Sequence, residues 1–224
     1  MTPLTRTFSL GSLFGIPLYV DASFFFVAAL VALGPGDFMA GLFVAAGLGA
    51  SILAHEFGHS LTARRYGFAT RRITLSALGG CAEIEGIPSV PSHEALVALA
   101  GPAVSFALAV LFFGLSFALA PLKHLLTASI WLCLTNAVLC AFNLLPGFPM
   151  DGGRVLRAWL SRKRSRVDAT RTAMNVGRVF AVLLACWGAF NVMSGNLGGA
   201  TSLLISWFIW RAGWAEYEAV LRGG

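Results

Sequence analysis

Two histidines and a glutamate, His55, His59 and Glu56, are the residues whose types and spacing most clearly suggest chemistry. On a helix, a spacing of four residues places the histidines on one face, about one turn apart. Two such imidazoles can bind one zinc ion, and Glu56 then lies beside the open coordination position, where it can accept a proton from water. The alternative is a hydrated helix end at a membrane surface.

The segment that carries this motif is membrane-like, because residues 38–54 contain no charged side chain. At about 1.5 Å per residue, this stretch covers most of the thickness of a bilayer's hydrocarbon core. Ionisable groups are costly in hydrocarbon, so a motif placed here indicates function.

A zinc ion bound by two histidines needs at least one more protein ligand, and the two other histidines of the chain are poor candidates. His93 is expected in a loop beside Glu94, where hydration explains it. His124 is expected on the opposite side of the bilayer.

Asp151 is a better candidate for the third ligand, because it follows an apolar segment that Pro146 and Pro149 interrupt and precedes the glycine pair 152–153. Broken backbone at membrane depth is tolerated only where protein or a wet cavity covers it. A helix cap or a partner of Arg154 is the alternative role for this carboxylate.

With residues 143–153 added to the motif at 55–59, the chain resembles the site-2 protease family of intramembrane zinc metalloproteases. The resemblance covers a catalytic core at about residues 38–155, and the small-residue element 100–102 also matches. The roles that it implies are zinc ligation for His55, His59 and Asp151 (one Zn²⁺ per chain), catalysis for Glu56, and substrate binding for Asn143.

The resemblance further implies hydrolysis of peptide bonds within or near the transmembrane segment of a single-span membrane-protein substrate, as in regulated intramembrane proteolysis. Many relatives carry an inserted PDZ domain or a C-terminal CBS pair, and neither is visible in the 224 residues. We therefore expect residues 1–224 to form a single transmembrane metalloprotease domain.

Composition excludes a soluble protein, since 57% of the residues are apolar, only 12% are charged, and the mean hydropathy is +0.77. A soluble domain carries about 25% charged residues. The net charge of +6 does not indicate nucleic-acid binding, because the basic residues fall between the apolar spans. We expect a multi-pass protein of the cell membrane, embedded in the lipid bilayer.

The apolar pattern predicts an all-α polytopic fold with about six transmembrane helices, which places both termini on one side. The expected spans are residues 22–33, 38–66, 95–122, 125–145, and two within 179–210 that residues 193–199 separate. Of the 16 lysines and arginines, only Lys123 falls on the side opposite to the termini. This asymmetry predicts cytoplasmic termini and a site towards the cytoplasmic side.

Three segments between or before the spans are polar or alternating. Residues 7–21 indicate short strands or an interfacial segment, and residues 71–86 a hairpin at the membrane surface, which together would form a small membrane-associated β element. The charged residues 151–178 predict an exposed loop with an amphipathic helix.

Residues 7–20 lack the features of a cleavable signal peptide. The four cysteines form no zinc-binding pair, and only Cys81 falls in a polar-flanked loop.

A metal or ion transporter is the alternative function, since transporters also place histidines and carboxylates at broken helices. Binding alone does not require a glutamate between the histidines, and no internal repeat is visible. A non-catalytic membrane scaffold is a third possibility, against which the intact motif argues.

Overall fold

A computed structural model describes residues 7–34, 36–86 and 90–223 of the chain. Arg6 and Pro35, which belong to the charge count and to the turn after the first expected span, lie outside these residues. The chain divides into two compact units, Met1–Pro88 with Ala100–Ala141, and Ser89–Leu99 with Phe142–Gly224. The elements in chain order are β1 (Thr7–Leu13), β2 (Ile16–Asp21), α1 (Ala22–Leu33), α2 (Phe38–Arg65), β3 (Thr70–Ser76), β4 (Gly79–Ile84), α3 (Pro91–Ala118), α4 (Lys123–Asn143), α5 (Asp151–Leu160), α6 (Arg166–Met193) and α7 (Gly199–Gly223).

Four of the helices in the described part of the chain are long and apolar enough to cross a membrane: α2, α3, α4 and α6. The two other expected spans correspond to α1, which is apolar but has only 12 residues, and to α7. The fold is therefore mostly helical and multi-pass, with at least these four membrane-spanning candidates.

In the first unit, the helix that carries the histidine motif is fixed at its beginning by a cap and by close packing. The Asp37 carboxylate accepts hydrogen bonds from the N–H groups of Met39 and Ala40, at 3.0 and 3.3 Å. The bond from Ala40 holds the pKa of the Asp37 carboxyl below its ordinary value. A Cβ atom at Gly41 would lie 1.9 Å from the carbonyl oxygen of Ala32, so glycine lets α2 pack directly on the backbone of α1.

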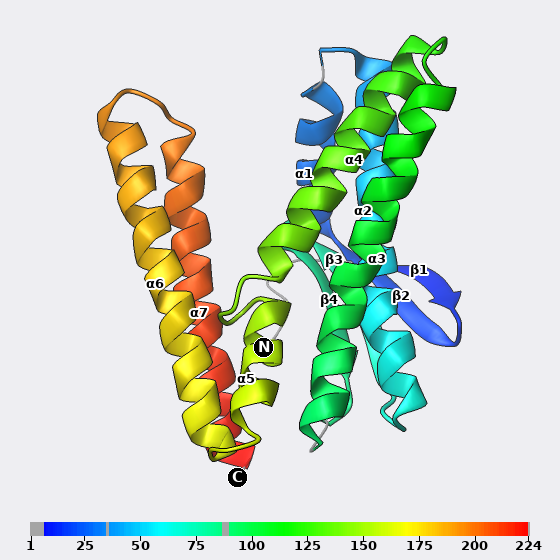
Figure 1. Cartoon of the computed structure of the whole chain (residues 1–224). Coiled ribbons are helices and arrows are strands. Elements are labelled where there is room, and N and C mark those ends of the chain that lie inside the picture. The colour runs from blue at the N-terminus through cyan, green and yellow to red at the C-terminus, as the bar shows by residue number, and fades with distance from the viewer. Residues whose placement is uncertain (1–6, 35, 87–89, 224) are drawn as a thin grey trace. The chain divides into compact units, whose positions relative to one another are not determined.

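A four-stranded sheet in the order β1-β2-β3-β4 also belongs to the first unit and lies beside α2 (Figure 1). Both hairpins are antiparallel, and β2 pairs with β3 in parallel. The strands at 7–21 and the hairpin at 71–86 are therefore confirmed. Ile16, Leu18 and Ile73 from the sheet form a buried cluster with Phe57, the residue that follows Glu56. The sheet thus packs on the part of α2 that carries the motif.

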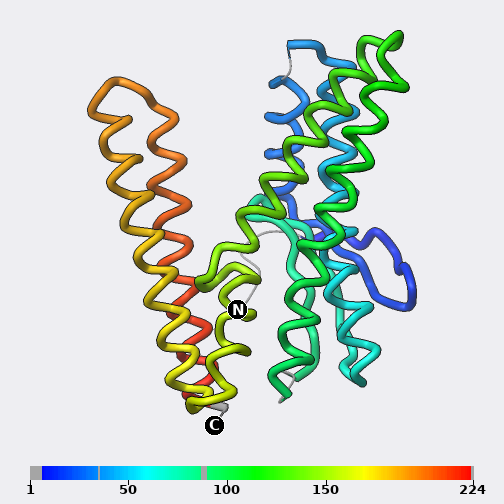
Figure 2. Tube along the Cα trace, in the orientation of Figure 1, coloured from blue at the N-terminus to red at the C-terminus, as the bar shows by residue number. Residues whose placement is uncertain are grey.

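In the second unit, α6 and α7 lie side by side and run antiparallel (Figure 2). The expected division of residues 179–210 is confirmed by the break between Met193 and Gly199. The exposed loop expected over residues 151–178 is wrong for its second half, because α6 already begins at Arg166. Its cap explains the early start: the hydroxyl of Ser165 accepts the N–H of Asp168 at 3.1 Å. The expected amphipathic helix is α5.

A network of buried charges also belongs to the second unit and is centred on Arg157 of α5, a residue that is 1% exposed. Its Nε donates to Oε1 of Glu94 at 2.7 Å, and its Nη1 donates to Oε1 of Glu216 at 2.9 Å. The guanidinium also lies over the ring of Phe148, 4.8 Å from its centroid. Arg166 lies 3.2 Å from the second carboxylate oxygen of Glu94. Arg157 therefore links the start of α3, the helix α7 and the segment before α5, and Glu94 links the start of α6 to the same network.

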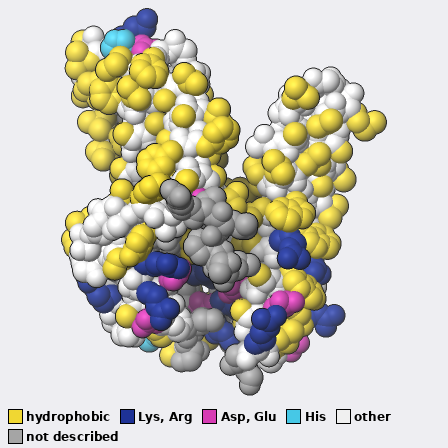
Figure 3. Space-filling view, turned by 180° about the vertical axis from the view of Figure 1, so that it is seen from behind, with side chains coloured by type: hydrophobic (Ala, Val, Ile, Leu, Met, Phe, Trp, Pro, Cys, Tyr) yellow, Lys and Arg dark blue, Asp and Glu magenta, His cyan; other side chains and the backbone are white. Residues whose placement is uncertain are grey.

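The surface separates charge from apolar side chains in a way that suits a bilayer (Figure 3). On the face shown, hydrophobic side chains are spread over the long helices, and most charged side chains gather at one end of each unit. Many large apolar residues of these helices are exposed, including Phe106, Trp187 and Trp207, at 63 to 65%. Exposure on this scale fits contact with lipid.

Removing the central arginine should destabilise the fold strongly. We expect Arg157→Gln to lower the free energy of unfolding by about 3–5 kcal/mol, because Glu94 would remain buried without its main counter-charge. Titration with sodium dodecyl sulfate, followed by circular dichroism, measures this change. Arg164→Gln, at an exposed position between α5 and α6, is the control and should change stability by less than about 0.5 kcal/mol. Equal stability of both variants would contradict the importance of the buried network.

Candidate metal centre

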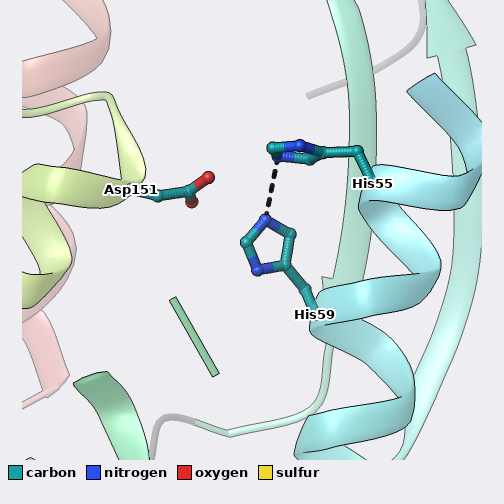
Figure 4. Close-up of side chains that lie close together, drawn as sticks. All are labelled: His55, His59 and Asp151. Carbon is teal, nitrogen blue, oxygen red and sulfur yellow. Dashed lines mark hydrogen bonds between the residues drawn. The ribbon is translucent and has the colours of Figure 1, made fainter. Parts of the chain in front are cut away.

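The two histidines of the motif face each other within α2. The chain is helical without interruption from Phe38 to Arg65, so His55 and His59 project from adjacent turns. Their side chains are 4% and 5% exposed, and their Nε2 atoms lie 3.1 Å apart (Figure 4). Two nitrogen ligands of a tetrahedral zinc ion, each about 2.0–2.1 Å from the metal, are separated by about 3.3 Å. The observed spacing fits this requirement.

The backbone of α3 leaves open the space in front of these nitrogen atoms. A Cβ atom at Gly101 would lie 2.2 Å from Nε2 of His59 and 2.7 Å from Nε2 of His55. Any side chain larger than hydrogen would thus occupy the place where both nitrogens converge. Within the small-residue element 100–102, the glycine at position 101 is therefore explained by steric exclusion.

Glu56 lies on a neighbouring face of α2, where strand β4 holds it. Its Oε2 accepts the N–H of Ala82 at 2.9 Å, and a Cβ atom at Gly80 would lie 2.5 Å from its Cγ. The missing side chain at Gly80 lets the strand approach, and the hydrogen bond fixes one carboxylate oxygen. The same sheet that packs on Phe57 therefore also orients the glutamate.

Asp151 is the first residue of α5 and is 9% exposed. The segment before it is compact: a Cβ atom at Gly152 would lie 2.4 Å from the carbonyl oxygens of both Leu144 and Leu145. Phe148, in the same segment, is 1% exposed and donates its N–H to the carbonyl of Ala173 at 3.2 Å. The glycine next to the aspartate therefore allows the tight turn that the prolines begin.

His55, His59 and Asp151 form one group of potential metal ligands in the part of the chain that the structure describes. One ligand atom of each lies within 4.8 Å of the other two, and all three residues are buried (Figure 4). Two imidazoles and one carboxylate are ligands that zinc accepts, and a zinc site with three protein ligands keeps a position open for catalysis. The donor set and its spacing therefore fit a catalytic zinc ion.

The other residues considered from the sequence lie outside this group. Asn143 ends α4 and is half-buried. His93 lies in the first turn of α3, and His124 bonds through Nδ1 to a carboxylate oxygen of Asp37. Cys81 is exposed on strand β4.

Sequence reasoning missed two contacts that the fold provides. The hydroxyl of Ser105 on α3 lies 2.9 Å from Nδ1 of His55, and the backbone of Ala82 reaches Glu56. Their partners are 50 and 26 residues away in the chain, and neither serine nor alanine signals such a role. The glycine pair 79–80 was the only available sign of a close approach by the hairpin, and it indicated a turn.

Comparison with known proteins agrees with this site. The family model described as Peptidase family M50 matches residues 43–129 and 120–184. The chain is 39% identical over 168 residues to the Rip3 protein of Mycobacterium tuberculosis, covering 73% of this chain and 43% of that protein. It is 35% identical over 188 residues to the zinc metalloprotease MJ0392 of Methanocaldococcus jannaschii, covering 80% and 52% of the two chains. The chain thus spans about half the length of the curated relatives that it matches.

Among solved structures, the site-2 protease from Methanocaldococcus jannaschii is similar to the whole fold. The TM-score is 0.66, the sequence identity is 28%, and the similarity covers 95% of each chain. The similarity in sequence and in fold therefore covers much more of the chain than the short histidine motif.

A methyl group at Gly101 should prevent metal binding. We expect Gly101→Ala to reduce the zinc content of the purified protein to well below half of the wild-type value, because the new Cβ would overlap both Nε2 atoms. Elemental analysis after gel filtration measures the zinc-to-protein ratio. Gly114→Ala is the matched control, because it makes the same change on the same helix where nothing lies within 4 Å. Full zinc content in Gly101→Ala would show that α3 does not bound the metal site.

Proposed function

Since the chain belongs to peptidase family M50, we propose that it is an intramembrane zinc metalloendopeptidase that cleaves membrane-protein substrates. The observation that carries the proposal is the buried group of His55, His59 and Asp151 with Glu56 between the histidines. The substrate class is a single-span membrane protein, cut within or near its transmembrane segment.

In this proposal, His55, His59 and Asp151 hold one Zn²⁺ per chain. The bound zinc supplies Lewis-acid polarisation of the scissile carbonyl and of the attacking water. Asp151 contributes the negative charge that offsets part of the charge of the cation.

Glu56 is the general base and later the general acid. It accepts a proton from the water that attacks the scissile carbonyl carbon, and it delivers a proton to the nitrogen of the leaving amine as the C–N bond breaks. The hydrogen bond from Ala82 to Oε2 supports this role, because it fixes one carboxylate oxygen and leaves the other available for the proton.

Asn143 is proposed to bind the substrate near the reacting carbonyl, where its amide N–H₂ can donate to the oxygen that becomes negative. The substrate helix must unwind locally, because its peptide bonds are shielded by helical hydrogen bonds. Strand β4 is at the edge of the sheet and is proposed to receive the unwound segment by strand addition.

For the topology, we propose six membrane segments, formed by the four long apolar helices together with α1 and α7. The asymmetry of basic residues supports cytoplasmic termini, with the active site towards the cytoplasm. The whole chain is then one metalloprotease domain whose catalytic core is about residues 38–155.

Replacing the proposed base should separate catalysis from metal binding. We expect Glu56→Gln to lower the rate of cleavage by at least about 10²–10⁴-fold, because an amide cannot accept the proton, while zinc content stays unchanged. The assay follows cleavage of a panel of single-span membrane proteins in detergent, together with elemental analysis. Retained turnover would remove Glu56 from the mechanism. Metal flux into liposomes without cleavage by the wild type would instead favour a transporter.

Replacing the proposed third ligand should weaken zinc binding itself, which the Glu56→Gln change leaves intact. We expect Asp151→Asn to lower zinc affinity by at least about tenfold, because the neutral amide is a much weaker ligand than the carboxylate. Competition with a chelator of known affinity measures this loss. Asp168→Asn, which changes an exposed carboxylate of the same unit, should bind zinc as the wild type does. Wild-type affinity in Asp151→Asn would mean that another residue completes the site.

A further inference from the structure

A buried serine on α3 contacts one of the two histidines on the side of the ring away from its Nε2 atom. Ser105 is 0% exposed, and its Oγ lies 2.9 Å from Nδ1 of His55. It follows Gly101 by one helical turn, so the two residues lie on the same face of α3. One of them clears space at Nε2 of His55, and the other makes a hydrogen bond at Nδ1.

This hydrogen bond has a chemical consequence for the ring. A neutral imidazole carries one N–H, and the other nitrogen has the free electron pair that a metal needs. Ligation through Nε2 therefore requires the proton on Nδ1, and in a buried position that N–H needs an acceptor. The Oγ of Ser105 stands at hydrogen-bonding distance to accept it.

We propose that Ser105 is a positioning residue that holds His55 in the Nδ1–H tautomer and presents its Nε2 to the zinc ion. The inference rests on the proposed function and adds to it a residue outside the ligand set. Outer partners of this kind fix the orientation of a ligating histidine, and their loss typically costs 10–100-fold in metal affinity.

The chain offers a matched comparison in Ser60, which follows His59 on α2. Ser60 is also 0% exposed, but its Oγ has no hydrogen-bond partner in the described part of the protein. Both serines are thus fully buried, and of the two only Ser105 bonds to a ring nitrogen. Removing each hydroxyl separates the effect of the hydrogen bond from that of a small change in packing.

The experiment compares Ser105→Ala, Ser60→Ala and Ser105→Thr in the full-length protein in detergent. Zinc affinity is measured by chelator competition, the Co²⁺-loaded protein by its visible d–d spectrum, and the metal-free protein by its Tm. We expect Ser105→Ala to bind zinc about 10–100-fold more weakly and to shift the Co²⁺ bands. Ser60→Ala should bind within about threefold of the wild type, and Ser105→Thr, which keeps the hydroxyl, should recover most of the lost affinity.

Two results would overturn the proposal for Ser105 while leaving the proposed function intact. One is wild-type zinc affinity and an unchanged Co²⁺ spectrum in Ser105→Ala. The other is an equal loss of affinity in Ser105→Ala and Ser60→Ala that follows the loss of metal-free Tm, which would indicate packing alone. A wild-type protein that binds neither zinc nor Co²⁺ would instead overturn the proposed function, and the role of Ser105 with it.

Discussion

The structure depends on one constraint. The imidazoles of His55 and His59 and the carboxylate of Glu56 must be accommodated in α2, where the 17 preceding residues, 38–54, are uncharged. Polar groups removed from water are costly unless each finds a partner. The fold meets this need from several elements. Helix α3 supplies a hydroxyl to one nitrogen of His55, strand β4 supplies an N–H to Glu56, and the facing Nε2 atoms of the histidines form the ligand pair that a cation satisfies.

Close approach of backbone is what makes these contacts possible. Gly101 brings α3 onto the histidines, and Gly80 brings β4 onto the glutamate. In both places the space that a side chain would fill is taken by a side chain of α2, from His55 and His59 at Gly101 and from Glu56 at Gly80. The glycines are thus required by the volume of the site, whereas their φ angles are not the reason, since neither lies in the left-handed region. The site is walled by main chain on two sides, which leaves little freedom for the side chains of α2.

Much of this could be predicted from the sequence, because the signals were local. The spacing of His55 and His59, the broken helix before Asp151 and the apolar runs each depend on a few neighbouring residues. The contacts of Ser105 and Arg157 could not be predicted, because their partners are 50 and 63 residues away. The early start of α6 was missed for another reason: charge indicated a loop, while the cap at Ser165 lets a polar segment continue as a helix.

The buried ion network stabilises α5, the helix that begins with Asp151. Asp151 begins α5, and Arg157, six residues later on the same helix, is bonded to Glu94 and Glu216 and lies over Phe148. Phe148 belongs to the turn that leads into α5. The arginine therefore fixes both the helix behind the carboxylate and the turn in front of it. A short helix in isolation would fray at its first residue. The network holds α5 in place, and this supports a fixed direction for the carboxylate at its first residue.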